Sequence, residues 1–104
     1  MDYDLYILKK DDFEKFINKL DKESKARISR DLSFLKIHGS DLRMPLAKKI
    51  HNKLYELRTP GKQRIRLIYT IVGLQIYLIH WFIKKTQKIP IKELKTALKR
   101  LTTI

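Results

Sequence analysis

The sequence predicts an α+β domain in which helices pack on a small, mainly antiparallel sheet. Three features predict it: a short alternating segment at the start, two helical apolar stripes in the following part, and three strand-like segments joined by turn residues before a last helical stripe. The expected order is β-α-α-β-β-β-α, with the helices on one face of the sheet. A chain of 104 residues has room for one core, so we expect residues 1–104 to form a single domain.

The N-terminal part is predicted to contain one strand and two helices. Residues 3–8 are β-prone and alternate in polarity. Asp11 or Asp12 fits the N-cap of the first helix, in which apolar residues recur every three or four positions. Asp21 fits the N-cap of a second helix, which runs to about His38.

The C-terminal part is predicted to be an antiparallel meander followed by a helix. Residues 42–52 are expected to form a basic loop or short helix. Turn residues then separate three strands at 53–58, 64–71 and 75–82. The third of these strands is apolar on both faces, which favours an interior position in the sheet. The last helix is expected to begin near Pro90, a residue suited to a first helical turn.

The charge of the chain points to a polyanionic partner. The sequence holds 24 lysine and arginine residues against 11 aspartate and glutamate residues, a formal net charge of +13. Residues 1–41 are balanced, with 9 of each sign, whereas residues 42–104 carry 15 basic and only 2 acidic residues. This distribution predicts binding to nucleic acid or to the ribosome. The alternative is a merely soluble, lysine-rich surface.

Several classes of function are disfavoured by composition. The chain has no cysteine, which excludes disulfides, thiolate metal sites and a cysteine nucleophile. The spacing of His38, His51 and His80 is not that of metal ligands, so we expect no metal site and no cofactor. Because no apolar segment approaches membrane-spanning length, we expect a soluble cytoplasmic protein without a membrane partner.

Period-two alternation predicts a charged face on the meander. Core positions at residues 55 and 57 turn Glu56 and Arg58 to the opposite face. In the next strand a core set of alternate apolar residues turns Arg64 and Arg66 to that same face. We therefore expect these four charged side chains together on an open sheet face.

Arginines around a lone carboxylate suit RNA cleavage. Attack of a ribose 2′-OH on the adjacent phosphate needs a base, cations to hold the phosphorane, and an acid for the leaving 5′ oxygen. Glu56 is expected to be ionised and to act as base, while Arg58 and Arg66 clamp the phosphate. The alternative is a cross-strand salt bridge on a solvated sheet face.

Other candidate site residues are open to two interpretations. His80 can donate the proton to the leaving group, or it can be a hydrogen-bonded core histidine. Trp81 and Tyr77 can stack on bases, although core packing is favoured by their apolar neighbours. The basic segment after the third meander strand is either a phosphate-binding loop or a solvated one.

Three segments carry a resemblance to a known family. They are Leu54–Arg58 (LYELR), Arg66–Tyr69 (RLIY) and His80–Pro90 (HWFIKKTQKIP). With these segments the chain resembles the RelE/ParE superfamily of toxins over essentially its whole length, and it is most similar to the phage-type HigB branch. The last segment is the most specific of the three.

The resemblance implies a RelE-like fold and an mRNA endoribonuclease that acts on the ribosome without a metal. It also implies a helix-turn-helix antitoxin (HigA-like) that forms a toxin–antitoxin hetero-oligomer. Arg66 matches the arginine that contacts the scissile phosphate, and Glu56 falls where some relatives place the base and others a lysine. The C-terminal tyrosine or histidine that several relatives use as acid is missing, which leaves Lys85 or His80 as the candidate acid. The expected RNA-binding residues are Lys48, Lys49, Lys53, Arg64, Lys84 and Lys88.

Two other functions are compatible with the same scaffold. A ParE-like protein poisons DNA gyrase and cuts no RNA, and a non-catalytic protein only binds RNA or the ribosome. Fold does not decide among these functions.

Overall fold

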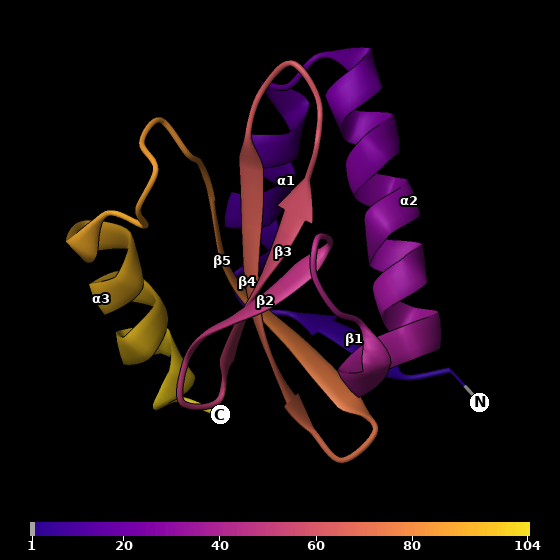
Figure 1. The fold of residues 1–104 in the computed structure, drawn as a ribbon, viewed down its shortest axis with the longest axis vertical. Helices are drawn as coiled ribbons and strands as arrows, with labels where there is room; N and C mark the ends of the chain where they lie inside the picture. Colours follow the sequence, from indigo (N-terminus) through magenta and orange to yellow (C-terminus); the bar gives the residue numbers. More distant parts are fainter. Residues whose placement is uncertain (1) are drawn as a thin grey trace.

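A computed structural model describes residues 2–104 and confirms the α+β class (Figure 1). The predicted meander strands are present as β3, β4 and β5. The elements in chain order are β1 (Asp4–Ile7), α1 (Lys10–Asn18), α2 (Lys22–His38), the short 3-10 helix η1 (Gly39–Asp41), β2 (Ala47–His51), β3 (Leu54–Thr59), β4 (Ile65–Val72), β5 (Gln75–Ile83) and α3 (Ile91–Leu101).

The sheet has five strands in the order β1-β5-β4-β3-β2. Strand β1 runs parallel to β5, and the other neighbours are antiparallel. The interior position expected for the last meander strand is confirmed, because β5 lies between β1 and β4.

The strand β2 corrects the prediction of a loop or short helix at residues 42–52. Lys48 pairs with Glu56 and Lys49 with Tyr55 across β2 and β3. Lysines have a low strand propensity, so local preference did not indicate a strand here, and pairing with β3 overrides it. Lysine-rich edge strands are common, since the charge discourages pairing with another chain.

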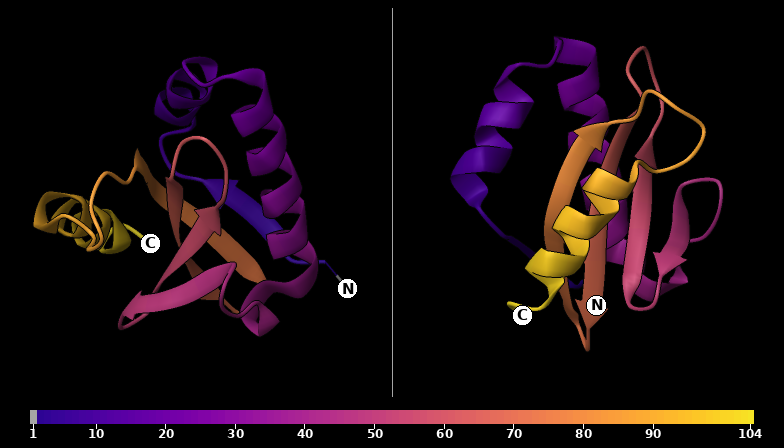
Figure 2. Two further views of the ribbon diagram at one scale, coloured as in Figure 1. Left: turned by 45° about the horizontal axis from the view of Figure 1, so that its top comes forward. Right: turned by 90° about the vertical axis from the view of Figure 1, so that its left-hand side faces the viewer.

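The helices cover both faces of the sheet, so the expectation that they share one face is wrong. Helices α1 and α2 pack over one face, around a core that includes Phe13, Ile28 and Leu67. Helix α3 packs over the other face, against Ile68 and Ile79. Figure 2 shows α3 on one side of the sheet and α1 and α2 on the other. The physical reason is that β4 and β5 are apolar on both faces, and each face must be covered.

The two N-terminal helices begin differently from one another. Helix α1 begins at Lys10, after Lys9 with φ 52°, and no side chain caps it. The predicted caps Asp11 and Asp12 are instead in its first turn, where negative charge is favourable to the helix dipole. The predicted cap Asp21 is confirmed: its Oδ1 accepts a 3.3 Å hydrogen bond from the backbone N–H of Ser24. Hydrogen bonding to Ser24, mainly through its side chain and also through its backbone, lowers the pKa of the Asp21 carboxyl.

The end of α2 is anchored to the start of the chain. Gly39 terminates α2 with φ 48° and ψ −119°, a conformation that favours glycine. The backbone N–H of Tyr3 donates to the carbonyl of Lys36 at 2.8 Å, and the Tyr3 hydroxyl bonds Ser40 Oγ at 3.1 Å. The Tyr3 ring therefore lies against Gly39, and this contact fixes where β1 begins relative to α2.

Strand β5 is longer than its parallel neighbour. Strand β1 pairs with residues 75–78 only, so the remainder of β5 has no strand on that side. Arg100 of α3 donates to the carbonyl of Ile79 at 3.1 Å, at the point where this unpaired stretch begins.

No helix within residues 2–104 has the length and apolar character needed to span a bilayer.

Candidate active site

A charged cluster joins two adjacent strands on the face that α3 partly covers. Oε1 of Glu56 accepts a 3.0 Å hydrogen bond from Nε of Arg58 on the same strand, β3. Nε of Arg66 on β4 lies 3.5 Å from the same oxygen. Arg58 and Arg66 are directly opposite each other in the β3–β4 register. One carboxylate thus stabilises two like charges that would otherwise repel.

The cluster is buried, which corrects the expectation of an open sheet face. The side chain of Glu56 is 1% exposed, that of Arg66 13% and that of Arg58 28%. The loop after β5 and helix α3 cover this side of the sheet, whereas Arg64 remains exposed. Burial lowers the pKa of Arg66, although a guanidinium remains protonated at neutral pH.

The cluster contains unused hydrogen-bonding capacity. Oε2 of Glu56 and Nε of Arg66 are buried and have no hydrogen-bond partner within residues 2–104. Unpaired buried polar atoms are costly, and active sites are one of the places where they persist. Oε2 of Glu56 is therefore an unused hydrogen-bond acceptor within the cluster.

Lys84 is the third cation at the cluster. It follows β5, and its backbone N–H donates to the carbonyl of Arg64 at 2.7 Å, which extends the pairing of β5 with β4 by one bond. Its side chain is only 9% exposed. Burial lowers the pKa of its ammonium; Glu56 opposes this shift, while the nearby positive charges of Arg66, Arg58 and Lys48 add to it.

Two cavities meet at Arg58. The first has a volume of 290 Å³ and lies between β2, β3, the loop after β5 and α3. The second has a volume of 380 Å³ and is lined by Arg58, Arg64 and Arg66 together with the Pro45–Leu46 and Thr59–Gly61 segments. The residues that line the first cavity are Lys48, Lys49, Ile50, Glu56, Arg58, Lys84, Gln87, Lys88, Ile89 and Leu94.

This arrangement is suited to a phosphodiester with a nucleoside on each side. Arg58 lines both cavities, and its guanidinium can bind a phosphate through paired donors. Apolar side chains in each, such as Ile89 and Leu46, offer contact to a sugar or a base. The structure brings most of the predicted basic and acidic site residues to the walls of these two cavities.

His80 is not brought to this site. Its Nε2 lies 3.0 Å from Oε1 of Glu93, and its Nδ1 lies 3.1 Å from a guanidinium nitrogen of Arg100. Both ring nitrogens are thus engaged with α3, and Ile68 separates His80 from Glu56 in the cross-strand row. Burial lowers the pKa of His80, the hydrogen bond and charge of Glu93 oppose this shift, and Arg100 adds to it.

Two predicted lysines and two aromatic residues also lie away from the cavities. Lys85 is exposed and lines neither cavity, and Lys53 is at the β2–β3 turn with φ 67°. Trp81 packs in the core with its ring centroid 4.9 Å from that of Phe13, so core packing is confirmed for it. Tyr77 is half-buried and stacks on another tyrosine.

The burial of Lys84 is the feature that sequence reasoning missed. Lys84 and Lys85 are equivalent members of a basic segment when only composition is considered. Continuing the alternation of β5 through Phe82, which pairs with Arg66, places Lys84 on the same face as the arginine. That signal was present in the sequence and distinguishes the two lysines.

Within residues 2–104, histidine, aspartate and glutamate side chains form no group of three or more placed to hold a metal ion.

Comparison with known proteins gives one family. The family model described as phage derived protein Gp49-like (DUF891) matches residues 15–102. No curated protein matches the chain.

Proposed function

The chain belongs to the phage-derived Gp49-like family, which is part of the RelE/HigB-type toxin group, and from this premise we propose that it is the ribosome-dependent mRNA endoribonuclease of a type II toxin–antitoxin pair. Within that group we assign it to the HigB branch, because of the LYELR, RLIY and HWFIKKTQKIP segments. The proposed reaction is attack of a ribose 2′-OH on the adjacent phosphate, without a metal.

The observation that carries this proposal is the contact of Glu56 with Arg58 and Arg66 at the wall of a lysine-lined cavity. In the proposed reaction Oε2 of Glu56 takes the proton of the 2′-OH. Arg58 and Arg66 bind the non-bridging oxygens, on which negative charge grows in the transition state. Because Glu56 is almost fully buried, the hydroxyl has to enter the cavity to reach it.

The energetics of buried ions favour a functional role for this cluster. Desolvation of a buried ion pair often offsets the attraction between its charges, so such a pair is a poor device for stability. A well-packed apolar set would serve the fold equally well. Retention of three charged groups, two of which have buried unsatisfied atoms, is better explained by a ligand that completes them.

Dependence on the ribosome follows from how little the chain itself offers to hold RNA. The two cavities at the charged cluster are small, 290 and 380 Å³, which suits the nucleotides around a single phosphate. Ordering of the substrate by the ribosomal A site supplies the alignment that these cavities alone do not. The +13 charge increases the rate of encounter with ribosomal RNA.

The proposed partner is a helix-turn-helix antitoxin with an acidic segment that covers the cavities. Carboxylates against the arginines would neutralise the site and exclude RNA. Acetic anhydride modification of the toxin alone and in the complex tests this interaction. We expect the antitoxin to protect Lys48 and Lys88, which are exposed and line the first cavity, while the α2 residue Lys22 is modified equally in both. Equal modification of all three lysines would contradict direct blocking of the site.

The function is tested by adding the purified protein to a reconstituted translation reaction and mapping mRNA 5′ ends by primer extension. We expect cuts at A-site codons that require ribosomes and decrease about 100- to 1,000-fold in Arg66→Ala. Arg43→Ala, which removes an exposed arginine remote from the cluster, is the matched control and is expected to cut like the wild type.

Two outcomes would contradict the nuclease. Translation that stalls with intact mRNA would identify a non-catalytic ribosome binder. Undisturbed translation, together with DNA cleavage complexes trapped on purified gyrase, would identify a ParE-like gyrase inhibitor.

A further inference from the structure

Cleavage by 2′-OH attack requires a proton for the leaving 5′ oxygen, and neither residue expected to supply it lines the cavity. Both ring nitrogens of His80 are occupied by Glu93 and Arg100. Lys85 is exposed to solvent and lies outside the cavity walls. The acid therefore has to come from another residue that lines the cavity.

We propose that Lys84 is this general acid and that its ammonium protonates the leaving 5′ oxygen. The inference rests on the proposed nuclease function and adds a catalytic residue to it.

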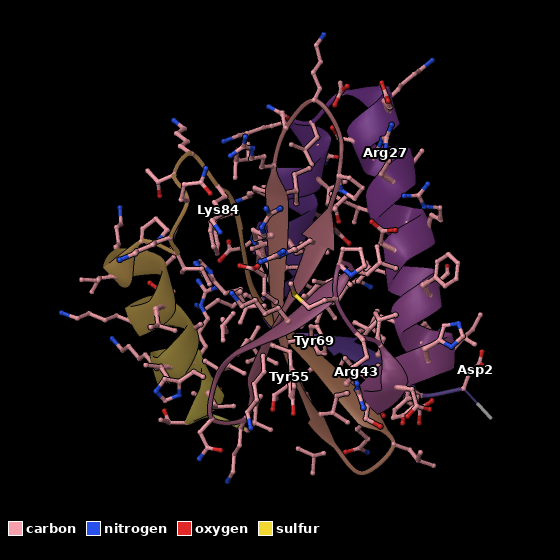
Figure 3. All side chains as sticks on the ribbon, viewed as in Figure 1. Asp2, Arg27, Arg43, Tyr55, Tyr69 and Lys84 are labelled. Carbon is pink, nitrogen blue, oxygen red and sulfur yellow. The ribbon has the colours of Figure 1, made fainter. Side chains whose placement is uncertain are left out.

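The position of Lys84 supports the assignment. Its backbone bond to Arg64 and the pairing of Phe82 with Arg66 place its side chain on the face of the arginines. Figure 3 shows Lys84 in the region between α3 and the sheet. It shares the walls of the 290 Å³ cavity with Glu56 and Arg58.

The ammonium of Lys84 is free to act on a ligand. Within residues 2–104, Glu56 is paired with Arg58 and Arg66, and the Lys84 side chain makes no hydrogen bond or ion pair. Its protons are therefore available to a substrate oxygen, unlike those of a lysine held in a salt bridge.

The surroundings of Lys84 make it a better acid than an ordinary lysine. Burial is the main cause that lowers the pKa of Lys84, and Glu56 opposes it. The other charged groups that face Lys84 are cations and lower its pKa further; they are Arg66 from β4, Arg58 from β3 and Lys48 from β2. Lys88 from the loop lines the same cavity, to which α3 contributes the uncharged Leu94. An acid whose pKa lies closer to neutrality gives up its proton more readily.

The step balances with these two residues alone. Glu56 takes the 2′-OH proton as the 2′ oxygen forms its bond to phosphorus. The bond from phosphorus to the 5′ oxygen breaks, and that oxygen takes a proton from Lys84. The products are a 2′,3′-cyclic phosphate and a 5′-hydroxyl end, and the neutral Glu56 and Lys84 regain their charges by exchanging a proton through water.

The first test compares Lys84→Arg and Lys84→Ala in single-turnover cleavage of mRNA on preformed ribosome complexes. Arginine keeps the positive charge but is too weak an acid, so we expect both variants to lose about 100- to 10,000-fold in rate. The wild-type rate should fall as alkaline pH deprotonates Lys84, and Lys84→Arg should lack this fall. Lys22→Arg on α2 is the matched control, and thermal unfolding verifies that all variants are folded.

The second test replaces the leaving 5′ oxygen at the cut site with sulfur. A thiolate leaves without protonation, so Lys84→Arg should cut this mRNA within about threefold of the wild type, whereas Arg66→Ala stays slow on both substrates. Wild-type rates for Lys84→Arg on the oxygen substrate, or an equal loss on both substrates, would overturn the assignment while leaving the nuclease intact. A wild-type protein that cuts neither mRNA would overturn the proposed function itself.

Discussion

Nε of Arg58 donates a 3.0 Å hydrogen bond to Oε1 of Glu56, two residues earlier on the same strand. The same oxygen lies 3.5 Å from Nε of Arg66 on the neighbouring strand. This shared oxygen makes the charges of the two arginines depend on one buried carboxylate. It also leaves the other oxygen, Oε2, without a partner within residues 2–104, so the group that holds the site together still has a free acceptor.

Removing the charge of Glu56 alone is expected to destabilise the protein more than removing the charges of Glu56 and Arg66 together. Glu56→Gln leaves two largely buried arginines without their anion and should lower the free energy of unfolding by about 3 kcal/mol. The double variant Glu56→Met, Arg66→Met removes a charge of each sign and should lose less than the single variant. Urea denaturation of Glu56→Gln, of the double variant and of its two single components, Glu56→Met and Arg66→Met, measures this. A double variant whose loss equals the sum of the two single losses would show that the residues are not coupled.

Gly39 is expected to tolerate alanine much less than Gly73 does. Both have positive φ, 48° and 62°, but a Cβ on Gly39 would overlap the Tyr3 ring whereas one on Gly73 has open space. Gly73→Ala should lower the free energy of unfolding by about 1 to 2 kcal/mol, and Gly39→Ala by about 2 to 4 kcal/mol because overpacking is added.

Combining Gly39→Ala with Tyr3→Ala should reduce the loss relative to the sum of the two single variants. Strictly additive losses in thermal or urea denaturation would place the strain of Gly39→Ala elsewhere.

The stability of the protein should fall in mild acid because of His80. Its folded pKa lies below the ordinary value of 6.5, so the unfolded chain binds the proton more readily. The stability contributed by neutral His80 is therefore complete above about pH 6.5 and is lost as the pH falls toward the folded pKa.

Comparison with His80→Gln isolates this contribution, because His38 and His51 are common to both proteins. The wild-type free energy of unfolding should fall more steeply in that window, by up to about 1.4 kcal/mol per pH unit. Parallel pH profiles for the two proteins would refute the effect.

The lysines of the cavity should set the salt dependence of RNA binding. In a Glu56→Gln background, Lys88→Ala should reduce the slope of log affinity for a short single-stranded RNA against log salt by about 0.7. Fluorescence anisotropy over a series of KCl concentrations measures the slope. Lys15→Ala, on α1 across the sheet, should leave the slope unchanged, and an equal change in both variants would indicate diffuse rather than local binding.

The elements with strong periodicity were predictable, and the elements set by tertiary pairing were not. Asp21 was recognised as a cap because its role is local. Strand β2 was not predicted, because Lys48 and Lys49 enter the sheet only through their pairing with β3. The position of α3 on the far face depends on which face of β4 and β5 the first two helices leave uncovered.

The sequence predicts which site residues share one face of the sheet, but it does not predict that this face is covered and forms a cavity. Alternation along β3 and β4 placed Glu56, Arg58 and Arg66 together, as the structure has them. Their burial depends on α3 and on the loop after β5, which pack against them from distant parts of the sequence. The same packing engages both nitrogens of His80, whereas alternation along β5 already distinguishes Lys84 from Lys85.

The bond from Arg100 to the carbonyl of Ile79 affects how the molecule meets other copies of itself. Where β1 stops, the uncovered stretch of β5 is an apolar strand edge, the kind of template that promotes aggregation. A guanidinium at the first free carbonyl, with α3 beside it, occupies the acceptor and brings positive charge to the edge. Charge at an open strand edge disfavours pairing with another chain, so the bond that anchors α3 to β5 also acts against edge-to-edge association.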